Sequence, residues 1–264
     1  MNIKTVSILG CGWFGFALAK QLITKGYRVK GSTTTPEKLE TLTAEGIDAY
    51  LINFTGEGIK ADKKFFDTDV LLICIPPKRN SAELNDFPTK IKAILDTAAQ
   101  GQAKVILISS TSVFSDENKA VNESSETRPD TSSGKVMLEA EQVFMSAQPS
   151  AYTIIRFSGL IGPERNPGRF FAGKTAIPNG LAPVNLIHQT DAVGLTIRLL
   201  EKQAFGHIYH ACAPQHPDKM QFYTKAAEVS GLQPPEFIAE KTSWKVVESI
   251  NVPRYLDYQF VVYI

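Results

Sequence analysis

The stretch that decides the fold is SILGCGWFGFALA, residues 7–19. Its glycines, Gly10, Gly12 and Gly15, lie between a short apolar run and a segment with apolar residues at helical spacing. In such a strand–turn–helix setting the first glycine allows a tight turn, the second lets the backbone approach a pyrophosphate, and the third lets the helix pack closely. The alternative is that the glycines only make a turn. The free N–H groups and positive dipole end of the helix favour a dinucleotide site, which we assign to Gly10, Gly12, Trp13, Phe14 and Gly15.

Strand-like and helix-like segments alternate outward from this loop. Residues Thr5–Leu9, Asp69–Pro77 and Lys104–Ser110 are apolar runs of the kind that a parallel sheet buries on both faces. Helical spacing of apolar residues follows each of them, as in Phe16–Lys25. The alternation predicts the α/β class, a Rossmann-type doubly wound parallel sheet with a small C-terminal substrate lobe.

The length of 264 residues suits one large domain or a domain with a small lobe. We expect residues 1–160 to form the dinucleotide-binding core and residues 161–264 a smaller lobe. A helix at 190–203, within the lobe, is expected to pack back on the core, so that the chain forms one continuous unit.

Composition excludes several functional classes. The formal net charge is +1, with 21% charged residues, so nothing favours nucleic acid or a membrane surface as a partner. The apolar runs are all shorter than a membrane span, and the first residues enter a strand pattern without a signal peptide. Three widely spaced cysteines, Cys11, Cys74 and Cys212, fit free thiols in a reducing compartment. We therefore expect a cytoplasmic protein.

The second expected strand, YRVKGS at 27–32, ends in residues that bear on the choice of cofactor. NAD-binding proteins usually place an Asp or Glu there for the ribose, but here the first carboxylate is Glu37. Small hydroxyls beside Lys30 and Lys38 would accept a 2′-phosphate, which favours NADP over NAD. The alternative is a polar loop in a protein that uses NAD. The other expected NAD(P) contacts are Ser32, Thr33, Thr34, Asn53, Pro76, Pro77 and Ser109.

Further motifs follow the glycine loop in a fixed order. They are CIPP at 74–77, ISSTSVF at 108–114, EAEQ at 139–142, IIRFSGLIGPERNPG at 154–168 and NLIHQTDAVG at 185–194. As an ordered set they resemble the extended short-chain dehydrogenases/reductases, the group of nucleotide-sugar epimerases and dehydratases, and in particular its atypical members.

The resemblance implies a catalytic site that this chain keeps only in part. In the family a serine or threonine three residues before the VY pair polarises the substrate oxygen, and Ser110 matches it. A tyrosine acts as general acid/base, and a lysine four residues later lowers its pKa; here Ser133 and Met137 hold those two places. A serine hydroxyl ionises at far higher pH than tyrosine and needs an adjacent base. Lys135 is the remaining local cation, so Ser110, Ser133 and Lys135 are the catalytic candidates.

The resemblance also indicates a substrate side. Thr111 and Ser112 supply hydroxyls, and Ser158 lies where the family faces the nicotinamide. Arg165 and Arg169 are suited to the diphosphate of a nucleotide-sugar, because a guanidinium binds phosphate in a planar fork; the alternative is a solvated basic loop. The tail holds four His and Cys residues, but their spacing does not favour a metal site, and we expect no metal at His207, His210, Cys212 and His216.

Three functions remain open. The first is an NAD(P)-dependent oxidoreductase or epimerase that acts on a sugar-like or nucleotide-linked small molecule with altered catalytic groups. The second is a non-catalytic dinucleotide-binding sensor or regulatory protein. The third is non-redox catalysis on another ligand. The surviving substrate-side motifs favour the first, and the family also suggests a homodimer.

Overall fold

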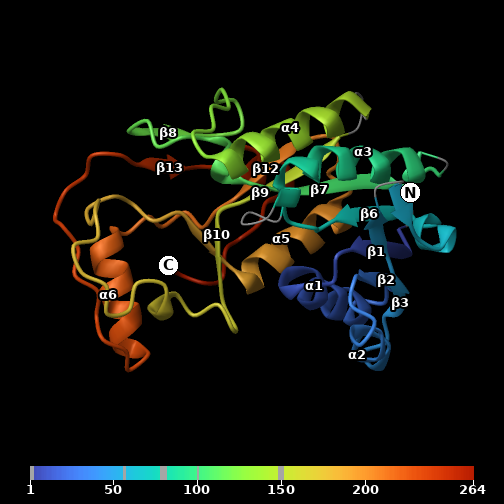
Figure 1. The fold of residues 1–264 in the computed structure, drawn as a ribbon, viewed down its shortest axis with the longest axis horizontal. Coiled ribbons are helices and arrows are strands. Elements are labelled where there is room, and N and C mark those ends of the chain that lie inside the picture. Colours follow the sequence, from blue (N-terminus) through green and yellow to red (C-terminus); the bar gives the residue numbers. More distant parts are fainter. Residues whose placement is uncertain (1–2, 56–57, 78–81, 100, 148–151) are drawn as a thin grey trace.

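Seven parallel strands form the central sheet of the computed structural model, which describes residues 3–55, 58–77, 82–99, 101–147 and 152–264. Adjacent strands are hydrogen-bonded in the order β12-β9-β7-β6-β1-β2-β3 (Figure 1). The bounds are β1 (Thr5–Leu9), β2 (Arg28–Thr33), β3 (Asp48–Leu51), β6 (Val70–Ile73), β7 (Lys104–Ser110), β9 (Thr153–Phe157) and β12 (Ile208–Ala211). Because β1, β6 and β7 are buried on both faces, their sequences are continuous apolar runs rather than alternating ones.

Helices cover both faces of this sheet (Figure 1). One apolar core joins the sheet to α1 (Trp13–Thr24), α2 (Lys38–Ala44) and α5 (Gln189–Lys202). A second core joins the other face to α3 (Phe87–Ala98) and α4 (Ser132–Ala147). The predicted Rossmann-type, doubly wound α/β fold is therefore confirmed.

A smaller part of the molecule lies beside the carboxyl ends of these strands, at the left of Figure 1. It contains α6 (Lys219–Val229) and a third apolar cluster around Ile161, Leu186 and Tyr223. Short strand pairs complete the fold: β4 (Asn53–Thr55) with β5 (Gly58–Lys60), β8 (Lys119–Val121) with β13 (Lys245–Val247), and β10 (Gly159–Ile161) with β11 (Leu186–His188).

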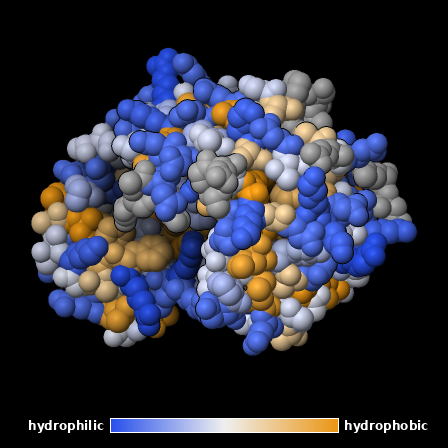
Figure 2. All heavy atoms as spheres, turned by 45° about the vertical axis from the view of Figure 1, so that its right-hand side comes forward, coloured by the Kyte–Doolittle hydropathy of each residue, from blue (hydrophilic) through white to orange (hydrophobic). Residues whose placement is uncertain are grey.

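The second half of the chain is shared between the sheet and the lobe. Strand β12 and helix α5 belong to the central layers although both come after residue 160. The expected division into residues 1–160 and 161–264 stays a prediction. The lobe and the larger part meet at a hollowed surface in the space-filling view, where apolar patches interrupt a mainly hydrophilic face (Figure 2).

Several boundaries differ from the sequence expectation for local reasons. Helix α1 begins at Trp13 rather than Phe16, because Gly12 already serves as its N-cap. Helix α5 begins at Gln189, since the His188 side chain accepts a hydrogen bond from the Thr190 N–H at 3.2 Å. The stretch AYTIIRFSGL at 151–160, which reads as one further strand in the sequence, divides into β9 and β10 around Ser158, and position 151 lies outside the described residues. No helix in the described part of the chain is long and apolar enough to cross a membrane.

Candidate functional site

The strand order reverses between β1 and β6, so the loops that leave these two strands diverge and open a crevice. A cleft of about 870 Å³ lies there. Its walls come from the glycine loop, the ends of β6, β7 and β9, and the C-terminal lobe. Among the expected site residues it is lined by Gly10, Gly12, Trp13, Phe14, Gly15, Pro76, Pro77, Ser109, Ser110, Thr111, Ser112, Ser158 and Arg165.

The three glycines have different surroundings. Gly10 has a φ of +102°, and a Cβ there would lie 3.0 Å from the Cγ2 of Ile75. A Cβ on Gly15 would lie 2.3 Å from the carbonyl oxygen of Gly10, so only glycine allows α1 to approach the loop this closely. A Cβ on Gly12 would meet no protein atom within 4 Å. Gly10 and Gly15 are thus required by the fold itself, whereas Gly12 borders open space in the cleft.

Ser32 holds the glycine loop in place. Its hydroxyl oxygen accepts a hydrogen bond from Gly10 N–H at 2.9 Å, and its carbonyl accepts one from Cys11 N–H at 2.8 Å. No side chain caps the first turn of α1, so the N–H groups of that turn are available to an anion. This combination of free donors and an uncrowded glycine is suited to phosphate groups.

A smaller hollow of about 290 Å³ continues on the other side of the loop. It is lined by Thr33, Thr34, Thr35, Lys38, Phe54 and Lys90, together with Ser32 and Pro76. Asn53 is not among these lining residues, although its neighbour Phe54 is. This is the place where the ribose and adenine of a dinucleotide would be expected.

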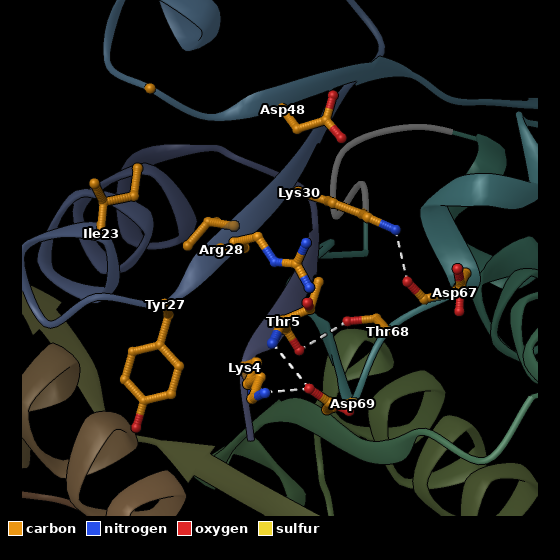
Figure 3. A pocket seen from close by; sticks show the side chains of 12 residues that line it. Lys4, Thr5, Ile23, Tyr27, Arg28, Lys30, Asp48, Asp67, Thr68 and Asp69 are labelled. Carbon is orange, nitrogen blue, oxygen red and sulfur yellow. Dashed lines mark hydrogen bonds between the residues drawn. The ribbon is translucent and has the colours of Figure 1, made fainter. Parts of the chain in front are cut away.

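Lys30 does not reach this hollow, so the expectation that it stands beside a 2′-phosphate is wrong. Its Nζ donates a hydrogen bond to the carbonyl oxygen of Lys64 at 2.5 Å and another, shown in Figure 3, to that of Asp67 at 2.6 Å. It therefore belongs to another depression, of about 770 Å³, which also exposes Lys4, Arg28 and Asp69 (Figure 3). That depression lies at the amino ends of β1 and β2, the edge opposite to the one where α/β sheets bind ligands.

Behind the main cleft lies a buried ionic network. Glu141 of α4 is fully buried and accepts two hydrogen bonds from Arg156 of β9, Nε to Oε1 at 3.0 Å and Nη2 to Oε2 at 2.7 Å. The Ser109 hydroxyl, at the end of β7, donates to the same Oε1 at 2.5 Å. The cleft-lining residue Ser109 is thus tied to α4 and β9, and its hydroxyl is already engaged.

His210 of β12 extends this network. Its Nε2 lies 3.4 Å from Nη1 of Arg156, and its Nδ1 lies 2.9 Å from the carbonyl oxygen of Glu248. Burial lowers the pKa of His210 to about 4, and the Arg156 charge acts in the same direction. The imidazole is therefore neutral, with Nδ1–H donating to Glu248 and Nε2 accepting from Arg156.

The first turns of α4 carry Ser133, Lys135 and Met137, the residues at and near the two catalytic positions of the family resemblance. Met137 lines the cleft where the family resemblance puts a lysine, whereas Ser133 and Lys135 are not among the lining residues. Lys135 is exposed to solvent. A Cβ on Gly134 would lie 2.3 Å from the carbonyl oxygen of Ser112, so the helix packs directly on the loop that carries Ser110 and Thr111. The positions that the family resemblance gives to a tyrosine and a lysine hold Ser133 and Met137 on this closely packed helix.

The two arginines expected on the substrate side are separated. Arg165 lines the cleft, and its guanidinium carbon lies 4.3 Å from the centre of the Trp13 ring. The Trp13 indole N–H in turn donates to the Pro163 carbonyl at 2.6 Å, which joins the glycine loop to the lobe. Arg169 is exposed and is not among the cleft-lining residues.

The lobe contributes residues that the sequence reasoning missed. Lys219 and Tyr223 of α6 line the cleft, as do Lys245 of β13, Trp244 just before that strand, and Asp116. These positions are far apart in the chain and belong to no motif, so no sequence signal marked them. Strands β13 and β8 pair in parallel, with Lys245 opposite Lys119. This pairing brings Asp116 and Lys245 together at the cleft.

The His and Cys residues of the tail have separate environments. His207 stacks on Tyr255 with ring centroids 3.8 Å apart, and His216 contacts the Val184 carbonyl through Nδ1 at 3.0 Å. The Cys212 thiol is buried, which raises its pKa to about 12. Among the described residues, no group of three or more His, Cys, Asp or Glu side chains could hold a metal ion.

Known proteins are similar to this chain in sequence and in fold. A family model described as NADP oxidoreductase, coenzyme F420-dependent, matches residues 5–112. Protein YeeZ of Escherichia coli (strain K12) is 36% identical over 264 residues, which cover 98% of this chain and 96% of that protein.

Solved structures are similar over nearly the whole chain. UDP-glucuronic acid 4-epimerase from Bacillus cereus in complex with NAD has a TM-score of 0.81 at 17% identity, covering 98% of this chain and 94% of that one. A short-chain dehydrogenase/reductase superfamily protein from Agrobacterium tumefaciens with bound NAD gives 0.79 at 16%, covering 98% and 93%. A functionally unknown conserved protein from Silicibacter pomeroyi DSS gives 0.76 at 22%, covering 97% and 93%. The likeness confirms the expected short-chain dehydrogenase/reductase and epimerase fold.

Proposed function

This chain belongs to the family of Protein YeeZ and has the fold of the short-chain dehydrogenases/reductases; from that premise we propose that it binds NAD(P). Its activity is that of an oxidoreductase or epimerase on a sugar-like or nucleotide-linked small molecule. The observation that carries the proposal is the geometry of the glycine loop. Gly12 borders open space, and α1 presents an uncapped first turn beside it.

The residues present fit a dinucleotide. The first-turn N–H groups of α1 bind the pyrophosphate, with Gly12 allowing the close approach. Thr34 and Lys38 bind the ribose and its 2′-phosphate, which favours NADP, and Phe54 packs against the adenine. A nicotinamide cofactor, when bound, accepts or donates a hydride. The chain's own groups must bind the substrate and move a proton.

We assign Ser110 as the residue that binds the reacting oxygen, and the proton is moved either by Ser133 and Lys135 or by Asp116. Ser110 hydrogen-bonds the reacting oxygen, in the role that the family gives to its serine. Ser133 and Lys135 must then reach the cleft through a shift of the first turn of α4. Asp116 is a further candidate proton acceptor, because its carboxylate already lines the cleft.

A dinucleotide-binding sensor is the second candidate. Met137 supports it, because a thioether in the place of the family's lysine neither lowers a neighbour's pKa nor holds a ribose by charge. A sensor needs the glycine loop but not the substrate side. Turnover therefore separates the two candidates, whereas cofactor binding is common to both.

The test is a titration of the purified protein with NADPH and NADH, followed by fluorescence, after removal of any nucleotide that co-purifies. Micromolar or tighter binding is expected, with NADPH preferred. Absence of binding by either nucleotide would overturn the proposal. A panel of nucleotide-sugars, assayed by cofactor absorbance and by sugar analysis, then separates an enzyme from a sensor.

A further inference from the structure

The side of the cleft that the C-terminal lobe forms has more positively than negatively charged side chains. Arg165, Lys219 and Lys245 line the cleft, and Asp116 is the one carboxylate among the lining residues that the structure describes. Asp116 is already paired with Lys245, whose side chain is only 16% exposed. Arg165 lies on the Trp13 ring, beside the glycine loop. The remaining cation faces the cleft without a compensating carboxylate.

That cation is Lys219, in the first turn of α6. Its ammonium group has no hydrogen-bond or ion-pair partner within the described parts of the chain, although the residue is half-buried. Tyr223 follows four residues later, on the same face of the helix. Two cleft-lining polar groups therefore come from successive turns of one helix.

The Tyr223 hydroxyl also has no partner within the described residues, although the side chain is only 8% exposed. The ring is fixed by Phe171 and Phe222, with centroids 4.7 Å and 5.1 Å away. Burial raises its pKa to about 12, so the hydroxyl stays a neutral donor at physiological pH. The hydroxyl oxygen does not belong to the fully buried unpaired polar atoms of the described residues, so it is accessible from the cleft and can donate to a ligand there.

Lys245 stands on the neighbouring wall of the cleft and is held in position. Its Nζ donates to Asp116 and to the Phe114 carbonyl at 2.9 Å, which leaves one of its three N–H bonds free. Asn185 fixes the strand by donating to the Lys245 carbonyl at 2.8 Å. The site thus offers two ammonium groups and one hydroxyl, all donors, from rigid elements.

We infer that Lys219, Tyr223 and Lys245 form a binding subsite for the acidic group of a second ligand, which binds in the same cleft beside the dinucleotide. The shared chemistry is that of an oxyanion, a phosphate or a carboxylate, and Trp244 offers an aromatic wall for the adjoining part of the molecule. The inference rests on the proposed function in one respect: the second ligand is the substrate that binds beside the dinucleotide.

The test uses calorimetric titration of the full chain with inorganic pyrophosphate and, separately, with glucuronate, both in the presence and in the absence of saturating NADPH. One of the two anions is expected to bind, and its identity distinguishes a phosphate from a carboxylate. Lys219→Met should weaken that binding about tenfold or more, since hydrogen bonds to charged groups contribute about 1.5–3 kcal/mol. Tyr223→Phe, which keeps the ring, should weaken it by a smaller factor.

Matched variants make the result specific. Lys219→Arg should keep most of the affinity, and Lys225→Met, an exposed lysine on the same helix, should leave it unchanged. NADPH affinity should not change in any of them. Failure of both anions to bind, or equal binding by wild type and Lys219→Met, would overturn the subsite. Anion binding that depends on Lys219, in a protein that binds neither NADPH nor NADH, would refute the proposed function and leave the subsite standing.

Discussion

The glycine loop and the start of α4 face the same cleft but differ in what they retain. The loop keeps each feature that a dinucleotide requires: Gly12 borders open space and α1 is uncapped. Helix α4 packs on the neighbouring loop through Gly134 and is tied to β9 through Glu141, but the places that the family resemblance gives to tyrosine and lysine hold Ser133 and Met137. The packing of α4 therefore does not depend on a tyrosine or a lysine at these positions.

The largest expected effect is on stability, and it tests whether the buried Glu141–Arg156 pair holds α4 in place. Glu141→Ala leaves Arg156 buried and unpaired, which should lower the free energy of unfolding by about 3–5 kcal/mol. Chemical denaturation measures it. The control is Glu126→Ala, which removes an exposed ion pair with Arg128 and should change the free energy of unfolding far less than Glu141→Ala does. Equal losses in the two variants would show that the buried pair does not anchor α4.

Low pH should lower the stability of the protein by favouring protonation of His210, which contacts Arg156 of the buried network. Its pKa in the folded protein is lowered to about 4, whereas an unfolded histidine titrates near 6.5. Between these values the unfolded chain binds the proton and the folded chain does not. Stability should therefore fall as the pH drops from about 6.5 toward about 4, by on the order of 3 kcal/mol. Unfolding curves of wild type and His210→Gln across this range test it, and parallel profiles would count against the assignment.

The Gly12→Val variant tests whether the glycine loop binds a dinucleotide. The new side chain meets no protein atom within 4 Å of its Cβ, so the fold should survive. It would instead occupy the space that the pyrophosphate needs, and NADPH affinity should fall more than about 100-fold, or about 2.7 kcal/mol. Gly15→Ala is the contrasting variant, because its Cβ would clash with the backbone and lower the melting temperature. Unchanged NADPH affinity in Gly12→Val would show that the glycine loop does not bind the pyrophosphate.

A smaller effect distinguishes the two cofactors. Lys38→Met should lower NADPH affinity about tenfold by removing a cation from the 2′-phosphate, with NADH affinity almost unchanged. Lys30→Met is the control, since its ammonium group binds two carbonyls at the opposite edge of the sheet. Equal effects of Lys38→Met on both nucleotides would remove the preference for NADP.

The smallest effect is expected from the Ser133→Ala/Lys135→Ala double variant. Neither residue lines the cleft in this structure, so nucleotide affinity should change less than about twofold. Turnover of whichever nucleotide-sugar the panel identifies should be kept as well if Asp116 takes the proton. A large loss of turnover with unchanged affinity would show that the shifted pair has taken over the catalytic role and that α4 is not merely a scaffold.

The sequence by itself determined the fold class and the place of the glycine loop. Both depend on local patterns: buried strands read as continuous apolar runs, and a tight strand–helix turn requires glycine at Gly10 and Gly15. The ordered motifs from Gly10 to Gly194 also identified the family resemblance, and with it the replacement of tyrosine and lysine by Ser133 and Met137.

Tertiary structure decided which side chains share the cleft. Lys30 and Lys38 are neighbours in one stretch of sequence, yet their side chains belong to opposite edges of the sheet. Asp116 and Lys245 are far apart in the chain and form an ion pair, because β8 and β13 pair in parallel. Strand direction and long-range pairing set such contacts, and neither is encoded in a local spacing of residues. The contribution of Lys219, Tyr223 and Lys245 to the cleft therefore became visible only in the folded chain.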